Sequence, residues 1–279
     1  MMSGDMSVRI QVLATPNLRT SYTKVVNYLK ELGCDALFLN LPENLELLVR
    51  DLVENRLSYR AFIEEVRERK LVPEPIEGWR YTAEPILKAL AEAKLHKPKL
   101  ECYCYEDPKY TELSVDVSCE IATLTLRANI RKEIHLKDWR SILLKGISLR
   151  RDALSKEADS IHEKATGECS CVSDLDGENL EQRLTEKGHE TNLINVEEFY
   201  HRTPLEMLEE RLAKGDISNE EAEKLVKDHL DYIENYILAS RNRDQAYYKW
   251  VYEKVPSLRE KIDSIEIRHL DVLLHPDNV

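Results

Sequence analysis

Apolar and polar residues recur along the chain with two different periods, which predict strands and helices in turn. Residues 7–14 form an apolar, partly β-branched run that ends at Thr15-Pro16-Asn17, a sequence typical of a turn. Apolar residues at helical spacing follow over residues 20–33, and a second apolar run covers residues 35–41. The order strand, helix, strand predicts a right-handed βαβ unit with parallel strands.

The same two periods continue to residue 200. Helices are expected at residues 41–55, 57–70, 82–97, 114–132 and 138–165, and three further strands at residues 99–106, 169–172 and 191–199. Thr82 and Asp138 begin two of these helical stretches and are residue types that cap a helix N-terminus. The predicted fold class is α/β, with a mainly parallel sheet of about five or six strands flanked by helices and a C-terminal helical hairpin.

The pattern becomes predominantly helical after Tyr200. Residues 203–215 and a long segment from Ser218 to about Lys254 predict the helical hairpin. The expected domains are therefore residues 1–200, which include a helical segment at 111–166, and residues 201–279, which include the hairpin and a possible final strand at 264–274. A helix of ~35 residues would be ~50 Å long, so we expect a homo-oligomer that forms through the C-terminal helices.

Composition limits the classes of partner. Among 279 residues, 42% are hydrophobic, which is enough for a sizeable core, and 33% are charged, as in proteins from hot environments. The formal charge of -12 disfavours nucleic acid and anionic lipid, which require a basic surface. No apolar stretch approaches the ~20 residues needed to cross a bilayer, and no signal peptide is recognisable. We therefore expect a cytoplasmic protein with no nucleic-acid or membrane partner.

Four short stretches carry a family resemblance. They are LATPN (residues 13–17), ALFLNLPEN (36–44), LRRDALSKEADSI (149–161) and CVSDLDGENLEQRL (171–184). In this order they resemble the motifs of the TraB/PrgY-like superfamily, whose relatives include the erythromycin esterases and ChaN-type proteins. In that family one strand ends in Gly-Thr-x-His and the next in an acidic residue. A later helix carries Glu-Arg-Asp, and a further strand ends in Gly-x-Gly-His. The resemblance implies that residues 7–196 adopt the same α/β architecture.

The departures from that family fall on its reactive side chains. Asn17 and Asp176 stand in the places of the two histidines, and Asn40 in the place of the strand-end acid. Arg150 replaces the glutamate of Glu-Arg-Asp. Thr15, Arg151 and Asp152 match the family pattern. The resemblance therefore implies that Arg151 and Asp152 are the candidate catalytic residues, whereas the remaining catalytic set is replaced.

The replaced positions allow a second chemistry. Asn17, Asn40, Glu43 and Asp176 offer hard oxygen ligands, which suit a divalent ion such as Ca²⁺, Mg²⁺ or Mn²⁺ better than zinc. Asp176 and Asn17 are the first candidate ligands, although no histidine stands near them to act as a base. Alternatively, Asp174 and Asp176 serve only the turn and the helix that begins near Glu178.

Arg151 and Asp152 also have two interpretations. On a helix that faces the strand ends, they could fix the backbone of a cleft or orient an anionic group of a substrate. They could equally belong to a solvated charged face, because the surrounding helix is rich in Arg, Lys and Glu.

Two Cys-x-Cys pairs lie on predicted strands, Cys102 with Cys104 and Cys169 with Cys171. If these strands pair, four thiolates could converge on zinc or an iron–sulfur cluster. Core packing and a disulfide are the alternatives. No two of the eight histidines have the i, i+4 spacing of a helical metal pair, and no phosphate-binding glycine motif is present.

Two functions remain open. The first is a TraB-like relative that has lost its catalytic set and acts as a binding or assembly protein, with no cofactor. The second is a metal-assisted hydrolase whose altered site contains Asn17, Asn40, Glu43, Arg151, Asp152 and Asp176. Convergence of these six side chains would favour the enzyme, whereas a cleft filled by the chain's own side chains would favour the binding protein.

Overall fold

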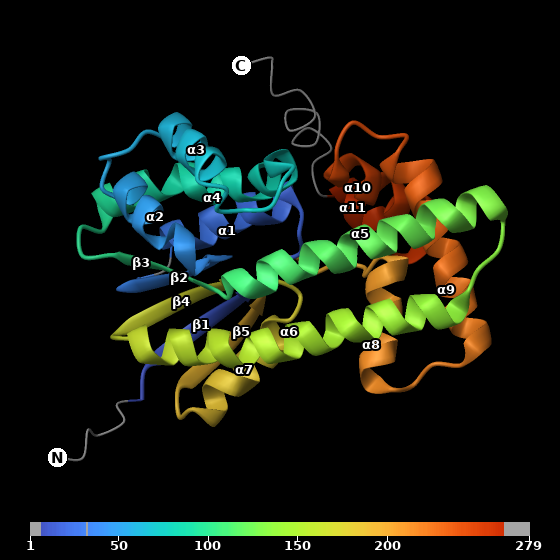
Figure 1. Cartoon of the computed structure of the whole chain (residues 1–279). Helices are drawn as coiled ribbons and strands as arrows, with labels where there is room; N and C mark the ends of the chain where they lie inside the picture. Colours follow the sequence, from blue (N-terminus) through green and yellow to red (C-terminus); the bar gives the residue numbers. More distant parts are fainter. Residues whose placement is uncertain (1–6, 32, 265–279) are drawn as a thin grey trace. The chain divides into compact units, whose positions relative to one another are not determined.

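Five strands and their connecting helices form the first of two compact units in the computed structural model, which describes residues 7–31 and 33–264 (Figure 1). The unit comprises the described residues up to 115 and residues 149–198. Its strands are β1 (Arg9–Ala14), β2 (Ala36–Pro42), β3 (Glu101–Glu106), β4 (Glu168–Ser173) and β5 (Glu190–Asn195). Its helices are α1 (Arg19–Glu31), η1 (Glu43–Leu45), α2 (Glu46–Val53), α3 (Tyr59–Glu68), α4 (Ile76–His96), the start of α5 (Pro108–Arg131), the second half of α6 (Leu136–Lys164), and α7 (Gly177–Glu186).

The strands are all parallel and lie in the order β3-β2-β4-β1-β5. Each consecutive pair of strands is joined through helices, as parallel pairing requires. The predicted α/β fold with a parallel sheet of five or six strands flanked by helices is therefore confirmed, with five strands in the described part of the chain. The last strand is shorter than predicted and ends at Asn195.

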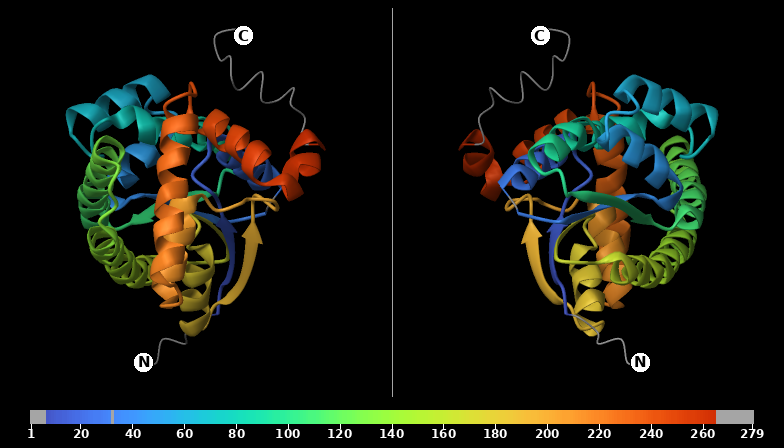
Figure 2. Two further views of the ribbon diagram at one scale, coloured as in Figure 1. Left: turned by 90° about the vertical axis from the view of Figure 1, so that its right-hand side faces the viewer. Right: turned by 90° about the vertical axis from the view of Figure 1, so that its left-hand side faces the viewer.

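Helices cover both faces of this sheet (Figure 2). Leu13 and Leu37 pack with apolar residues of α1 to α4 on one face, whereas Val12 and Phe38 pack with residues of α6 and α7 on the other. Successive residues of a strand point to opposite faces. Both faces are buried, so most of β2 and the last three residues of β1 (12–14) appear in the sequence as apolar runs and not as alternating patterns.

The second unit comprises residues 116–148 and the described residues from 199 onward. It contains the greater part of α5, the first part of α6, α8 (Pro204–Lys214), α9 (Asn219–Tyr232), the π-helical turn η2 (Ile233–Ile237), α10 (Arg243–Lys254), η3 (Pro256–Leu258) and α11 (Arg259–Ser264). Helices α8 and α9 form the first part of the predicted hairpin. Each begins with a capping box, in which a Ser or Thr side chain and a Glu side chain three residues later each accept the other residue's backbone amide. Residues 116–148, which the sequence analysis assigns to the first domain, are thus grouped with the C-terminal helices.

Several element boundaries differ from the predictions. Helix α4 starts at Ile76, so Thr82 lies inside it and donates its hydroxyl to the Trp79 carbonyl. Helix α6 starts at Leu136, which places Asp138 in its first turn and not at its cap. The segment from Ser218 to Lys254 is interrupted, because η2 ends at Ile237 and Asn242 starts α10 by accepting the Gln245 amide.

This interruption removes the argument that a helix ~50 Å long extends beyond its own domain. The homo-oligomer itself remains a prediction. The possible final strand at 264–274 lies outside the described residues, apart from Ser264, which ends α11. Within residues 7–31 and 33–264, no helix is both long enough and apolar enough to span a membrane.

Candidate functional site

The carboxyl ends of β1 and β4 lie side by side in the sheet. Thr15, directly after β1, donates its amide to the Ser173 carbonyl at the end of β4 over 2.9 Å. The chain then continues from β1 into α1 on one face of the sheet, and from β4 into α7 on the other. In parallel α/β sheets, ligands bind at strand ends where neighbouring connections leave toward opposite faces. This edge of the sheet is therefore the candidate functional site.

The turn from β4 to α7 is held close to β1 by a glycine. A Cβ atom at Gly177 would lie 2.8 Å from the Cβ of Ala14, closer than real side chains approach. Asp174 shapes the same turn, because its Oδ1 accepts the Asp176 amide over 2.8 Å. Asp176 occupies the N-cap position of α7, but its side chain makes no capping hydrogen bond. Its carboxylate is therefore available to another partner.

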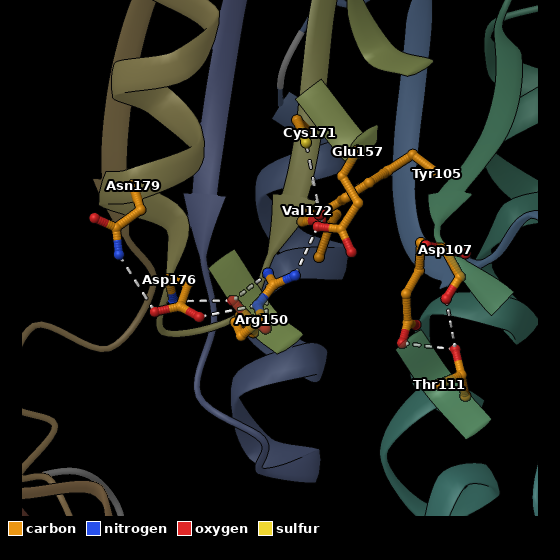
Figure 3. A network of polar contacts seen from close by, with 11 residues as sticks. Tyr105, Asp107, Thr111, Arg150, Glu157, Cys171, Val172, Asp176 and Asn179 are labelled. Carbon is orange, nitrogen blue, oxygen red and sulfur yellow. Dashed lines mark hydrogen bonds and ion pairs between the residues drawn. The ribbon is translucent and has the colours of Figure 1, made fainter. Parts of the chain in front are cut away.

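That partner is Arg150 of α6, which binds three carboxylates (Figure 3). Its Nη1 lies 2.7 Å from Oε2 of Glu157, its Nη2 lies 3.2 Å from Oδ2 of Asp174, and its Nε lies 2.9 Å from Oδ2 of Asp176. The Arg150 guanidinium carbon also stands 5.3 Å from the centre of the Tyr110 ring, within cation–π range. We call Arg150, Glu157, Asp174 and Asp176 the Arg150 cluster.

Burial makes this cluster electrostatically strong. The Arg150 side chain is 11% exposed and that of Glu157 is fully buried. Burial raises the pKa of Glu157, and Arg150 opposes the shift. Burial and then Asp174 raise the pKa of Asp176, again against Arg150. Burial alone would lower the pKa of Arg150, but Asp174 and Glu157 outweigh it and raise that pKa above its ordinary value. The cluster thus holds a permanent cation beside two acids, Glu157 and Asp176, whose pKa values burial raises.

Glu106, the last residue of β3, is a further acid at this edge. Its Oε1 accepts the Thr111 hydroxyl over 2.9 Å. The pKa of Glu106 is raised to about 8. Burial is the largest cause, Glu157 adds to the increase, and the hydrogen bond from Thr111 opposes it. At neutral pH this side chain is therefore mostly a neutral carboxylic acid, which can donate a proton.

The predicted site residues divide into two groups. Asn17 is exposed in the loop after β1, and Asp176 lies in the loop after β4, so these two belong to neighbouring strand ends. Glu43 accepts a hydrogen bond from Ser160 of α6, ten residues from Arg150. At 1.5 Å per residue, the α6 positions that contact Glu43 and Asp176 are about 15 Å apart. Asn40 lies within β2 and is partly buried. The structure therefore does not bring all of these side chains together.

Arg151 and Asp152 both lie exposed on α6, next to the buried Arg150. Neighbouring residues on a helix point in directions about 100° apart, so only Arg150 of the three turns inward. The roles suggested for Arg151 and Asp152 stay predictions, and any ligand they hold would bind at the helix surface.

The residues do not fit a divalent ion as they are arranged. Asp176 gives one oxygen to Arg150 and the other to Asn179, over 2.9 and 3.4 Å. A cation at Asp176 would stand beside the Arg150 guanidinium and repel it. Among the described residues, no group of three His, Cys, Asp or Glu side chains is placed to hold a metal ion.

The two Cys-x-Cys pairs do not converge. Strand β2 lies between β3 and β4, so the strands that carry the pairs are not neighbours. Cys102 and Cys104 belong to the core on one face of the sheet, and Cys169 and Cys171 to the core on the other. All four are buried free thiols. Burial raises the pKa of Cys102 to about 12 and that of Cys169 to about 11, so both stay protonated. A shared thiolate site is not formed.

Sequence reasoning missed Glu157 and Glu106, and it assigned Arg150 only as a replacement. A signal for two of them was present. Arg150 and Glu157 share a helical face with the buried residues Leu143, Leu154 and Ile161, so both stand at core positions of α6. A charged residue at a core position requires a partner. The contact between His162 and His189, with Nδ1 and Nε2 2.8 Å apart, had no such signal in the sequence.

The chain is thus an α/β protein whose parallel sheet is covered by helices on both faces, with a buried charged cluster at the carboxyl ends of its strands. No protein-family model, curated protein or solved structure matches this chain significantly. The chemistry of the Arg150 cluster and its surroundings is therefore the evidence that bears on function.

Proposed function

We propose that this chain is a binding or assembly protein that retains a TraB-like α/β scaffold without the catalytic set of that family. One observation carries the proposal: the Arg150 guanidinium binds Glu157, Asp174 and Asp176 of the same chain. Arg150 thus engages an oxygen of each of these three acids, whereas Oε1 of Glu157 is buried with no hydrogen-bond partner among the described residues. An active site, by contrast, leaves its acids and bases accessible to a substrate.

Two further features support the proposal. Burial of Arg150 and Glu157 gives the cluster the character of a structural ion pair in the interior. Arg151 and Asp152, the residues that match the family pattern, are exposed on α6 and free to contact a macromolecule. The proposal includes the cytoplasmic location and the absence of a nucleic-acid partner that were expected from the sequence, and it requires no cofactor.

Glu106 favours a second candidate, a hydrolase with an altered site. A carboxylic acid with a pKa of about 8 is of the kind that acts as a general acid at neutral pH. In this alternative Glu106 would protonate a leaving group at the strand ends, and Asp174 or Asp176 would have to leave Arg150 to assist.

The two candidates differ in what the acids do, and paired variants test this. Turnover of p-nitrophenyl acetate and bis-p-nitrophenyl phosphate is measured with and without Mn²⁺, and Mn²⁺ binding is followed by electron paramagnetic resonance. Glu106→Gln and Asp176→Asn are the test variants. Glu178→Gln removes an exposed acid from the first turn of α7 and is the matched control.

The proposal expects no turnover above buffer that depends on Glu106, and no saturable Mn²⁺ site that depends on Asp176. Hydrolysis abolished by Glu106→Gln and retained by Glu178→Gln would establish the hydrolase instead. A Mn²⁺ site lost only in Asp176→Asn would have the same consequence.

A further inference from the structure

Helix α5 carries apolar residues on two opposite sides within the second unit. Val117, Thr125 and Ala128 form its buried side, and Thr125 approaches Nε2 of His229 at 3.4 Å. On the opposite side Leu126 is 62% exposed and Ile130 is 72% exposed. Together with the exposed Cys119 and Ala122 they lie three or four residues apart, which places them in one stripe. We call Cys119, Ala122, Leu126 and Ile130 the outer stripe of α5.

Charged residues flank this stripe, with the acidic ones before the basic ones along the helix. Asp116 and Glu120 lie toward the N-terminal end of α5, and Arg127 and Arg131 toward the C-terminal end. At 100° per residue all four fall on the same flank of the stripe. Within the described part of the chain, Arg127 and Arg131 make no ion pair, whereas Glu120 makes one with Lys145 in which both side chains are about half exposed.

We propose that the outer stripe of α5 binds the same stripe of a second copy of this chain, with the two helices antiparallel. A twofold axis midway between residues 120 and 127 sets Glu120 opposite Arg127 of the other copy. The same axis sets Asp116 opposite Arg131, because residues 116 and 131 have the same midpoint. In an antiparallel pair with this axis, the flank packs against the same flank of the other copy, so these charges meet with opposite sign at four positions. In a parallel twofold pair the flank would instead pack against the opposite flank of the other helix, and these four charge pairs would not form.

The apolar residues agree with this axis to within half a residue, because residues 122 and 126 have their midpoint at 124. Ala122 faces Leu126 of the other copy, so a small side chain meets a large one, and the small Cys119 and Ala122 allow the helices to approach. The large aromatic side chains of the C-terminal helices do not compete for this role, because Tyr232, Tyr236, Tyr247 and Trp250 are buried. The inference rests on the proposed assembly function and names its partner.

Sedimentation equilibrium of the full chain tests the surface. The wild type is expected to form a concentration-dependent dimer. Leu126→Glu should raise its dissociation constant at least tenfold, since a carboxylate would be buried at the centre. Leu95→Glu is the control, because Leu95 is 73% exposed on α4 in the first unit and should leave the dimer unchanged. Circular dichroism should show both variants folded, because both side chains are exposed.

A charge exchange tests the direction of the helices. Asp116→Arg and Arg131→Asp should each weaken the dimer at low salt, and the double variant should restore it. If the double variant dimerises as weakly as the two single variants, the antiparallel pairing is overturned.

Cross-linking tests the register. Thr123 lies beside the axis, so Thr123→Cys in a Cys119→Ser background should form a disulfide dimer under mild oxidation. The two native Cys119 side chains would stand about 14 Å apart along the helix direction and should not cross-link to each other. A wild-type monomer, a dimer that survives Leu126→Glu, or self-cross-linking through Cys119 would each overturn the inference. Turnover that depends on Glu106 would overturn the proposed function and not the dimer. The same assays on the Leu126→Glu variant keep the two outcomes separate.

Discussion

Arg150 and Glu157 form an ion pair of 2.7 Å between two side chains of the same helix, and Glu157 is fully buried. The two residues are seven positions apart on α6, which is two turns, so they lie on one face of the helix. Two loop aspartates complete the coordination of Arg150 from the end of β4. Through these two contacts Arg150 links α6 to the carboxyl edge of the sheet.

Removal of Arg150 should destabilise the first unit strongly. Arg150→Met leaves Glu157 buried without its cation, and breaking such a pair costs about 3–5 kcal/mol of unfolding free energy. Urea denaturation followed by circular dichroism measures the loss. Arg151→Met is the matched control, because this neighbour is exposed and should change stability by less than about 0.5 kcal/mol. Adding Glu157→Met to Arg150→Met should restore part of the stability, and equal loss in all variants would argue against the pair.

Glu106 should make the folded state less stable as the pH rises. Its folded pKa is about 8 and its ordinary value is 4.5, so between these values the folded chain holds a proton that the unfolded chain releases. Stability from this group is therefore complete below pH 4.5 and is lost as the pH rises through 8. Glu106→Gln stays neutral at all pH values and should gain stability over the wild type between pH 6 and 9.

Glu112→Gln serves as the control for this comparison, since Glu112 is an exposed acid near the start of α5. Denaturation curves at pH 6 and pH 9 give the difference. If the two glutamine variants show the same pH dependence as the wild type, Glu106 is ionised in the folded chain.

His229 should make the second unit sensitive to acid. Burial lowers the pKa of His229 from 6.5 to about 4, so the folded chain keeps the imidazole neutral while the unfolded chain takes up a proton. Stability is present above pH 6.5 and falls as the pH drops to 4, by roughly 3 kcal/mol for this shift. His229→Leu should reduce the dependence of stability on pH over this range, whereas His135→Leu, at an exposed position, should not. NMR titration of the His229 ring protons would contradict this if the midpoint lay near 6.5.

Two glycines should respond oppositely to alanine. Gly177→Ala would bring a Cβ to within 2.8 Å of Ala14 and push α7 away from β1, at a cost of about 1–3 kcal/mol. Gly78 lies inside α4 with no atom within 4 Å of an added Cβ. Gly78→Ala should therefore stabilise the chain by about 0.5–1 kcal/mol. Thermal denaturation of both variants measures the two shifts, and a destabilised Gly78→Ala would show that the helix is constrained there.

Part of the site could be read from the sequence and part could not. The turn at Asp174 and Asp176 follows an apolar run and precedes a helical pattern, which is enough to place both at a strand end. The partner of Asp176 was not recognisable, because Arg150 lies 26 residues earlier and reaches it only after α6 packs on the sheet. The raised pKa of Glu106 likewise depends on burial by neighbours that are remote in sequence.

The sequence alone determined the α/β class, the strands and most helices, because each depends on the spacing of apolar residues within a few turns of chain. The tertiary structure decided the strand order β3-β2-β4-β1-β5, and with it the separation of the cysteine pairs. It also decided that the helix after Ser218 is interrupted and that Arg150 turns inward. These outcomes depend on which distant surfaces bury one another and on where a buried charge finds its partner, and neither is encoded in a local period.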